Sequence, residues 1–287
     1  MKRPIFLIFT NAMILIVIFC LLAQSLIVVS RLAVTTEAKG TVEVQRGGRG
    51  AWQPLVQKLA VKVGDNVRTG KNSQVEFVYA DGTRFKLMPE SQLTVSRASY
   101  NSALKSEDSD LHLTQGKVFV RIMKSLTPSS SFQVDTPTAV AAVRGTIFSV
   151  EAKEGRTQVA VWKGHVDVSS TNGKEQTQIT PGRCVDVAPN VVKTEADTAL
   201  AAQFAQETSI VKPYLDFDAH FNGNGGILVR GSTEAGDTLM INGTRQKVFG
   251  NGGFLKVIPV KAGESSVTVT TQDKHGAMSS LTKTATQ

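Results

Sequence analysis

The sequence predicts an all-β protein that follows a single N-terminal transmembrane helix. Three observations lead to this fold class. Valine, threonine and phenylalanine, which favour strands, occur in short runs separated by turn residues. The pattern Gly-x-Val-x-Val begins at Gly40, Gly116 and Gly164, and each copy predicts a turn followed by a strand with period-two alternation. A long apolar run near the N-terminus predicts the helix.

The apolar run covers residues 5–29. As a helix it would extend about 35–40 Å, enough to cross a hydrocarbon core of ~30 Å. The positive charges before the run outweigh Arg31 behind it, so we expect an uncleaved signal anchor over residues 1–30. The chain would then cross the cytoplasmic membrane once, with its N-terminus inside and its bulk periplasmic or extracellular. A cleaved signal peptide with a weak late cleavage site at residues 36–38 is the alternative.

Charge and cysteine content restrict the possible partners. The 287-residue chain carries a formal net charge of +8, and many basic residues lie in the first half of the exported part. Anionic envelope polymers or phospholipid headgroups are possible partners, and a solvated positive face without a partner is the alternative. Aromatic residues do not interleave the basic ones, so no nucleic-acid partner is expected. Cys184 is the only exported cysteine, which excludes an internal disulfide there and favours a small buried hydrophobe over a reactive thiol.

A first all-β domain is predicted over residues 40–188, behind a polar stalk at residues 31–39. Its strongest hairpin signal consists of residues 75–79 and 83–87 around the Asp81-Gly82 turn. Asp81 thus occupies the ordinary position of an aspartate, beside a turn glycine.

Residues 135–150 form the most distinctive stretch of this domain. Gly145 interrupts an apolar run, as glycine does where a strand bulges or bends. In an unbroken strand the side chain of Arg144 would be buried. Either Gly145 resets the register, or a carboxylate holds the guanidinium, with Asp81 and Asp135 as candidate partners. We favour a structural corner over a ligand-binding arginine.

The first domain contains a series of motifs in a fixed order. They are Gly40-x-Val-x-Val44, Trp52, Val63-Gly-Asp-Asn-Val-Arg-Thr69, Asp81-Gly-Thr83, Gly116-x-Val118, Thr136-Pro137, Val143-Arg-Gly-Thr-Ile-Phe148 and Gly164-x-Val-x-Val168. This order resembles the FecR domain over about residues 38–188. The resemblance implies an all-β extracytoplasmic domain, solenoid- or sandwich-like. Its best-known members are transmembrane anti-sigma regulators, which relay a signal from an outer-membrane transporter to a cytoplasmic sigma factor.

One departure from that family bears on function. Only about four residues precede the apolar run here, too few to fold around a sigma factor. We therefore expect the resemblance to extend to the exported module and not to the cytoplasmic part of the relay.

A helical linker and a second β domain are predicted next. In the linker, residues 189–213, Thr194 is the candidate N-cap of one helix of about four turns. Residues 214–287 contain strand runs between glycine turns, which predict a small immunoglobulin-like sandwich. The order of valines and turn glycines over residues 214–285 is similar to the glucodextranase B-like domain, a bacterial immunoglobulin-like module. The absence of cysteine there excludes an antibody-type disulfide.

No metal site, cofactor or catalytic centre is predicted. Aligned as an EF-hand loop from Asp218, the sequence ends at Val229, where a bidentate glutamate is needed, so a polar loop is favoured. The four histidines lie on separate segments and predict no zinc site. A Gly-x-Ser-x-Gly motif does not occur, and the glycine-rich residues 223–226 and 250–253 lack the Gly-Lys-Ser/Thr of a phosphate loop.

These patterns favour a membrane-anchored, non-enzymatic binding or scaffold protein of the bacterial envelope. We expect it to engage wall polysaccharide, peptidoglycan or another envelope protein. Trp52, Arg144 and Trp162 are the candidate contact residues, because aromatic and arginine faces commonly anchor sugars and proteins, and Asp81 is a candidate structural or binding residue. One alternative is a FecR-like signalling accessory, a sensor or regulator that lacks the cytoplasmic anti-sigma segment. Another is a carbohydrate-enzyme accessory or a degraded enzyme.

Overall fold

The strands form where apolar and polar residues alternate. In β3 (Val42–Gln45) and β15 (Val166–Ser170) the valines are buried and the residues between them are more exposed, as the Gly-x-Val-x-Val pattern predicts. The computed structural model describes residues 28–122, 129–143, 145–188, 191–196 (backbone only), 213, 215–250, 252–260, 265–273 and 278–286. Across these ranges the fold is all-β, and the sole helical element is a 3-10 turn, η1 (Arg46–Gly48).

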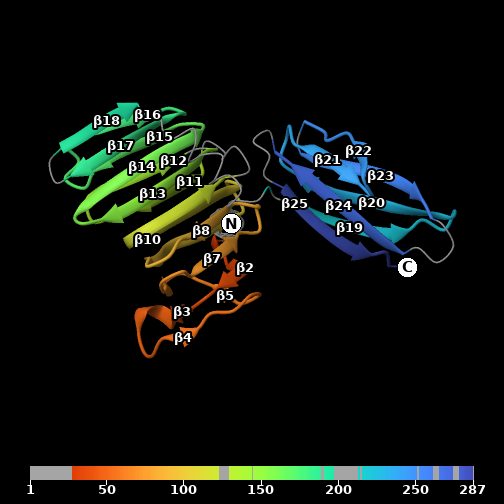
Figure 1. Cartoon of the computed structure of the whole chain (residues 1–287), viewed down its shortest axis with the longest axis horizontal. Helices are drawn as coiled ribbons and strands as arrows, with labels where there is room; N and C mark the ends of the chain where they lie inside the picture. The colour runs from red at the N-terminus through yellow and green to blue at the C-terminus, as the bar shows by residue number, and fades with distance from the viewer. Residues whose placement is uncertain are drawn as a thin grey trace, which may run out of the picture.

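The first domain consists of two large sheets that share one long strand, β10 (Ser106–Arg121). One sheet has the order β4-β3-β6-β9-β10-β11-β12-β15-β16, and β1 pairs with the far end of β9. The other has the order β5-β2-β7-β8-β10-β13-β14-β17-β18. Neighbouring strands are antiparallel, except that β10 and β11 are parallel. Because β10 belongs to both sheets, they close around one core as in a barrel, and we call β1–β18 the barrel domain (Figure 1).

The other strands of this domain have the following bounds: β1 Val28–Ser30, β2 Ala33–Lys39, β4 Gln53–Pro54, β5 Ala60–Val61, β6 Asn66–Thr69, β7 Gln74–Val78, β8 Arg84–Leu87, β9 Gln92–Asn101, β11 Ser131–Asp135, β12 Ala139–Val143, β13 Ile147–Lys153, β14 Arg156–Lys163, β16 Gln176–Ile179, β17 Arg183–Ala188 and β18 Val191–Ala196. The predicted hairpin around Asp81-Gly82 is confirmed, since β7 and β8 pair directly. Phe77 and Phe85 stack across this hairpin with ring centroids 4.8 Å apart, inside the core that both sheets enclose.

Gly116 lets β10 pass from one sheet to the other. Up to Gln115 the strand pairs with β9. It pairs with β13 from Gly116 onward and with β8 from Val118 onward. Gly116 has φ +86°, and a Cβ there would lie 2.1 Å from Ser91 Oγ and 2.5 Å from Ser91 Cα. Both the backbone conformation and the close approach therefore require glycine.

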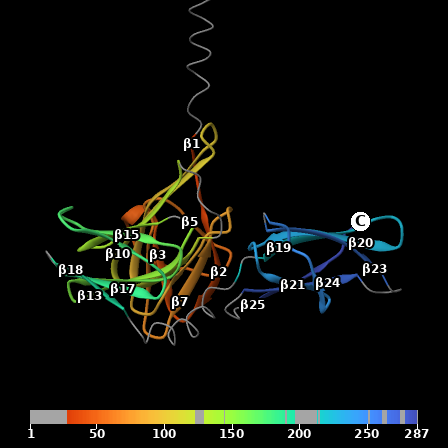
Figure 2. The ribbon, with the colours of Figure 1, turned by 90° about the horizontal axis from the view of Figure 1, so that it is seen from above.

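The second domain is a sandwich of two smaller sheets with its own core. One sheet has the order β19-β20-β23 and the other β22-β21-β24-β25; Figure 2 shows them as two layers. Their facing side chains, such as Phe217, Val229 and Val267, form a second apolar cluster. The bounds are β19 Leu215–Phe221, β20 Gly226–Thr233, β21 Thr238–Ile241, β22 Thr244–Gln246, β23 Gly253–Pro259, β24 Ser266–Gln272 and β25 Met278–Thr284. We call this unit the sandwich domain.

The helical elements of the predicted fold class are wrong where the structure describes them. The linker prediction began a helix at Thr194, but residues 191–196 form β18, which pairs with β17 along its whole length. The edge of β17 offers six residues of backbone pairing, and this outweighs a weak capping signal. Residues 197–212 lie outside the described ranges.

The predicted transmembrane helix is likewise unsupported. None of the described residues belongs to a helix long and apolar enough to cross a membrane. Val28 and Val29, which the prediction placed in the span, belong to β1 and pair with β9. Residues 1–27, which include the rest of the predicted span, lie outside the described ranges.

The predicted interruption at Gly145 is confirmed. β12 ends at Val143, β13 begins at Ile147, and Gly145 between them has φ +63°. A register shift follows at once between Ile147 and Phe148. Arg144 itself lies outside the described residues.

We predict that Gly116→Ala lowers the free energy of unfolding by about 2–4 kcal/mol, because the added methyl group combines a positive φ with a clash against Ser91. Urea denaturation measures this. Gly155→Ala is the matched control: Gly155 has φ +71° but open space at the Cβ position, so the loss there should be only about 1 kcal/mol. Equal losses in the two variants would contradict the steric role of Gly116.

Candidate functional site

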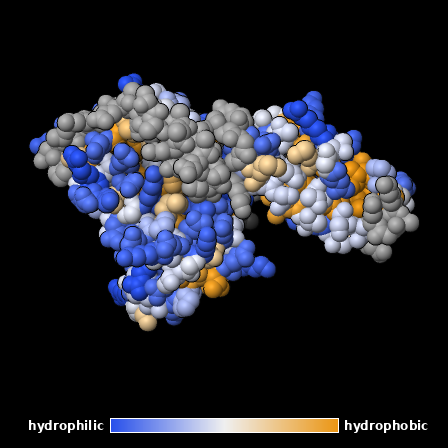
Figure 3. All heavy atoms as spheres, in the orientation of Figure 1, coloured by the Kyte–Doolittle hydropathy of each residue, from blue (hydrophilic) through white to orange (hydrophobic). Residues whose placement is uncertain are grey.

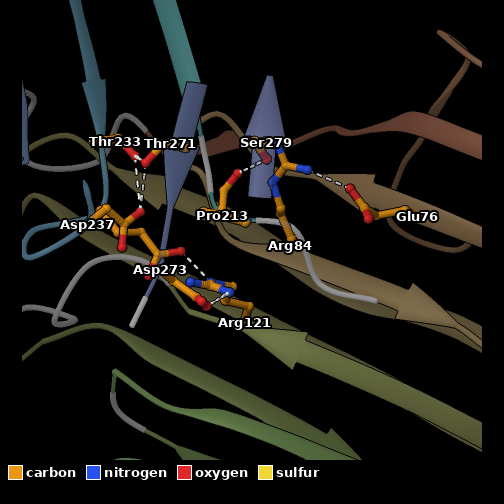
Figure 4. Close-up of polar contacts among 10 residues, drawn as sticks. Glu76, Arg84, Arg121, Pro213, Thr233, Asp237, Thr271, Asp273 and Ser279 are labelled. Carbon is orange, nitrogen blue, oxygen red and sulfur yellow. Dashed lines mark hydrogen bonds and ion pairs between the residues drawn. The ribbon is translucent and has the colours of Figure 1, made fainter. Parts of the chain in front are cut away.

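The barrel and sandwich domains meet at Arg121, the last residue of β10. Its side chain is 1% exposed and reaches two carboxylates of the sandwich domain (Figure 4). Arg121 Nε donates a hydrogen bond to Glu234, in the loop after β20. A terminal guanidinium nitrogen donates to Asp273 Oδ2, just after β24, at 3.1 Å. We call these three buried residues the Arg121 clamp.

The charge on the clamp arginine is maintained by its partners. Burial alone would lower the pKa of Arg121, but the hydrogen bond to Glu234 and the charges of Glu234 and Asp273 raise it above its ordinary value. The guanidinium therefore stays protonated at every physiological pH. When the domains separate, water hydrates the guanidinium and both carboxylates, so the clamp acts mainly by fixing the position in which the domains meet and less by net attraction.

A third carboxylate, that of Asp237, lies beside the clamp. Its Oδ2 accepts hydrogen bonds from Thr233 Oγ1 at 3.2 Å and Thr271 Oγ1 at 3.1 Å. Burial, followed by the charge of Glu234, raises the pKa of Asp237, and the two hydroxyl groups and Arg121 oppose that change. In the part of the chain that the structure describes, no three His, Cys, Asp or Glu side chains are grouped to hold a metal ion.

A groove of about 840 Å³ also lies between the domains. Strands β2, β7 and β8 of the barrel domain line one side, and β19 and β25 of the sandwich domain line the other. Figure 3 shows the two domains as separate lobes. Glu76 and Arg84 lie on the barrel side of the groove and form an ion pair at 2.6 Å. On the other side, Ser279 Oγ donates a hydrogen bond to the carbonyl oxygen of Pro213.

The two tryptophans predicted as contact residues are engaged within the barrel domain. The guanidinium carbon of Arg68 lies 4.2 Å from the ring centroid of half-buried Trp52, just before β4. Trp162, on β14, packs against Phe119 with ring centroids 5.7 Å apart and contacts buried Cys184. They lie on different elements, and neither belongs to the Arg121 clamp or lines the groove.

Asp81 has a structural environment of its own. Its carboxylate accepts hydrogen bonds from the backbone and hydroxyl of Thr83 and pairs with Arg31 at 2.8 Å. The guanidinium carbon of Arg31 also lies 4.4 Å from the ring centroid of Tyr79. Burial of Tyr79 raises the pKa of its phenol to about 12. Asp81 thus holds the turn between β7 and β8 next to β1, and its described partner is Arg31. Since Arg144 is not described, its predicted pairing with Asp81 or Asp135 stays a prediction.

The clamp residues were missed by sequence reasoning. Arg121 is separated from Glu234 by 113 positions and from Asp273 by 152. No local pattern connects them, and a single arginine at the end of an apolar strand is an ordinary surface feature. The available signal was that Arg121 lies within an apolar run, with Val118, Phe119 and Val120 before it and Ile122 and Met123 after it.

The sequence comparison finds a family match for one region of the chain. Residues 65–167 match the FecR protein family model. This FecR region includes β10 and therefore Arg121. A comparison with curated proteins yields no match.

Solved structures show more distant likenesses. Two structures of candidate anti-sigma factors from Parabacteroides distasonis are 18% and 16% identical to the chain, with TM-scores of 0.39 and 0.40. The alignments cover 49% and 54% of this chain and 64% and 68% of those proteins. The chain thus spans less than two thirds of the first. A polysaccharide lyase aligns at 9% identity and a TM-score of 0.21, over 89% of this chain and 39% of the lyase. At these scores the likenesses carry no functional argument.

We predict that Arg121→Met destabilises the protein by about 3–5 kcal/mol, because it leaves two buried carboxylates without their counter-charge. Guanidinium denaturation of the full chain measures the loss. Arg156→Met is the control, since the Arg156–Asp186 pair at 3.6 Å is exposed and should contribute less than about 1 kcal/mol. The triple change Arg121→Met, Glu234→Gln and Asp273→Asn should recover part of the loss. A triple variant less stable than Arg121→Met would contradict this account.

We also predict that Asp237→Asn is more stable than the wild type at pH 7. A carboxyl group whose folded-state pKa is raised favours folding while protonated, and that contribution is lost as pH rises through the folded-state value. The difference between the two proteins should shrink as pH falls toward the unfolded-state value of about 3.9. Urea midpoints measured from pH 4 to pH 7 test this. A variant less stable than wild type at pH 7 would show that the hydroxyl hydrogen bonds dominate.

Proposed function

We propose that this protein is a non-enzymatic signal-transduction component, in which the FecR-like barrel domain relays the state of the sandwich domain. The observation that carries the proposal is that the FecR region, residues 65–167, contains β10. The Arg121 side chain at the end of this strand binds Glu234 and Asp273 of the sandwich domain. β10 carries Arg121 at its end and belongs to both sheets of the barrel domain. A partner that moved the sandwich domain would therefore act on the strand through which the two sheets are connected.

The resemblance to FecR domains supports a partner in the cell envelope, since the best-known members receive their signal from another envelope protein. The scaffold role that we expected from the tryptophans has less support. Arg68 covers one face of Trp52, and Trp162 packs on Phe119, so neither ring is set out as an open platform for a sugar. A regulatory protein–protein contact accounts for the junction better than polysaccharide anchoring does.

Transcript profiling tests the proposal. Deletion of the gene should change a coordinated set of transcripts, and the wild-type chain and the Arg156→Met variant should both restore it. The variant with Arg121→Met, Glu234→Gln and Asp273→Asn should fail to restore it, because the domains are no longer held by charge, although its circular dichroism shows a folded chain. Unchanged transcripts after deletion would refute a signalling role, and restoration by the triple variant would refute relay through the clamp.

A further inference from the structure

The groove between the domains contains buried polar atoms that have no hydrogen-bond partner in the described part of the chain. Glu76 is 2% exposed, and its Oε1 accepts hydrogen bonds from Arg84 at 2.6 Å and from Thr36 Oγ1 at 3.0 Å. Glu76 Oε2, Arg84 Nε and Thr35 Oγ1 have no hydrogen-bond partner among the described residues. An unsatisfied buried donor or acceptor costs about 1–3 kcal/mol. These covered atoms are at least one acceptor and one donor that a ligand carrying both would satisfy once they are exposed.

The opposite side of the groove is an unpaired strand edge. β25 pairs with β24, and the hydrogen bond from Ala285 N to Ser265 O fixes which residues of β25 face that neighbour. By alternation, the backbone groups of Met278 and Ser280 point away from β24. Both residues line the groove, and over the described residues no strand pairs with this part of the edge.

Just beyond the end of β25, the chain pairs with β19 on the same side. Thr286 forms a parallel bridge with His220, and backbone hydrogen bonds connect it to Ala219 and Phe221 of β19. This side of the chain thus accepts a backbone partner at Thr286. Beside the groove β19 is not paired with it, so among the described residues no strand uses the hydrogen-bonding groups there.

The groove lining favours a peptide over a sugar. Val34, Met278 and Leu281 are 40%, 48% and 39% exposed, which provides aliphatic surface for apolar side chains. Sugars are usually held against an open aromatic face, and the aromatic residue named in the lining, Tyr79, is only 1% exposed. A peptide group carries one donor and one acceptor, as the Glu76–Arg84 pair requires.

We propose that this groove binds an extended polypeptide segment, which adds as a strand to β25 and places a backbone amide near Glu76 and Arg84. The inference deepens the proposed function, because it names the class of partner that the domain junction receives. In the present arrangement of the domains, Glu76 Oε2 and Arg84 Nε are covered by the protein. A peptide reaches them as the domains part, so that its binding is linked to the Arg121 clamp.

The test selects phage-displayed random nonapeptides on the full chain and measures one enriched synthetic peptide by fluorescence anisotropy. Ser280→Pro removes an outward N–H without breaking the β24–β25 ladder, and we expect it to weaken binding about tenfold or more. Glu76→Gln replaces the acceptor by a donor and should also weaken binding. Val257→Pro, on the exposed edge strand β23 of the other sheet, is the matched control and should change the affinity less than about twofold. Circular dichroism melts confirm that each variant is folded.

Several outcomes would overturn the inference. They are the absence of enriched peptides, equal affinity for wild type and folded Ser280→Pro, and binding of a chitin tetrasaccharide in the groove that Ser280→Pro abolishes.

Measurements of peptide binding and of transcripts distinguish the two proposals. Peptide binding by a protein whose deletion leaves transcripts unchanged would support the groove and reject the signalling role. Transcript changes without any peptide binding would reject the groove alone.

Discussion

The arrangement of the molecule depends on one buried guanidinium shared between two domains. Arg121 comes from the barrel domain, while its two carboxylate partners belong to separate loops of the sandwich domain. Neither apolar core extends into the other, since each domain encloses its own cluster of buried side chains. Among the described residues, the junction is therefore formed largely by charge and hydrogen bonds, which are directional and lose their strength once water enters. Such a junction has a defined closed geometry and can open without exposing a hydrophobic core.

Because Arg121 lies on β10, the domain junction is connected directly to both sheets of the barrel domain. A strand that belongs to two sheets transmits a displacement to both, because each sheet is a continuous hydrogen-bonded network. Gly116 permits this sharing, since a side chain there would collide with Ser91. The groove beside the clamp lies against β7 and β8, and β8 is a direct neighbour of β10. The proposed peptide contact and the domain contact thus lie on adjacent strands.

Local patterns in the sequence were sufficient to predict much of the barrel domain. Alternating valines placed the strands that follow Gly40 and Gly164, and the Asp81-Gly82 turn placed the β7–β8 hairpin. The turn predicted at Gly116 is wrong, because Gly116 lies inside β10, where the strand passes from one sheet to the other. The helix predicted from Thr194 failed because its capping signal is local, whereas the available edge of β17 is a property of the folded sheet. The Arg121 clamp was beyond local reasoning for the same reason. The carboxylates that pair with Arg121 come from the other domain, so they can be identified only from the folded structure.

The distribution of tryptophan has a practical consequence. Both tryptophans of the chain, Trp52 and Trp162, belong to the barrel domain, and the sandwich domain has none. Intrinsic indole emission therefore reports on one domain only, while the far-ultraviolet signal of the strands reports on both. Comparison of the two signals during unfolding distinguishes independent melting from joint melting without any label. The wild-type chain thus carries its own optical measure of how tightly its halves are coupled.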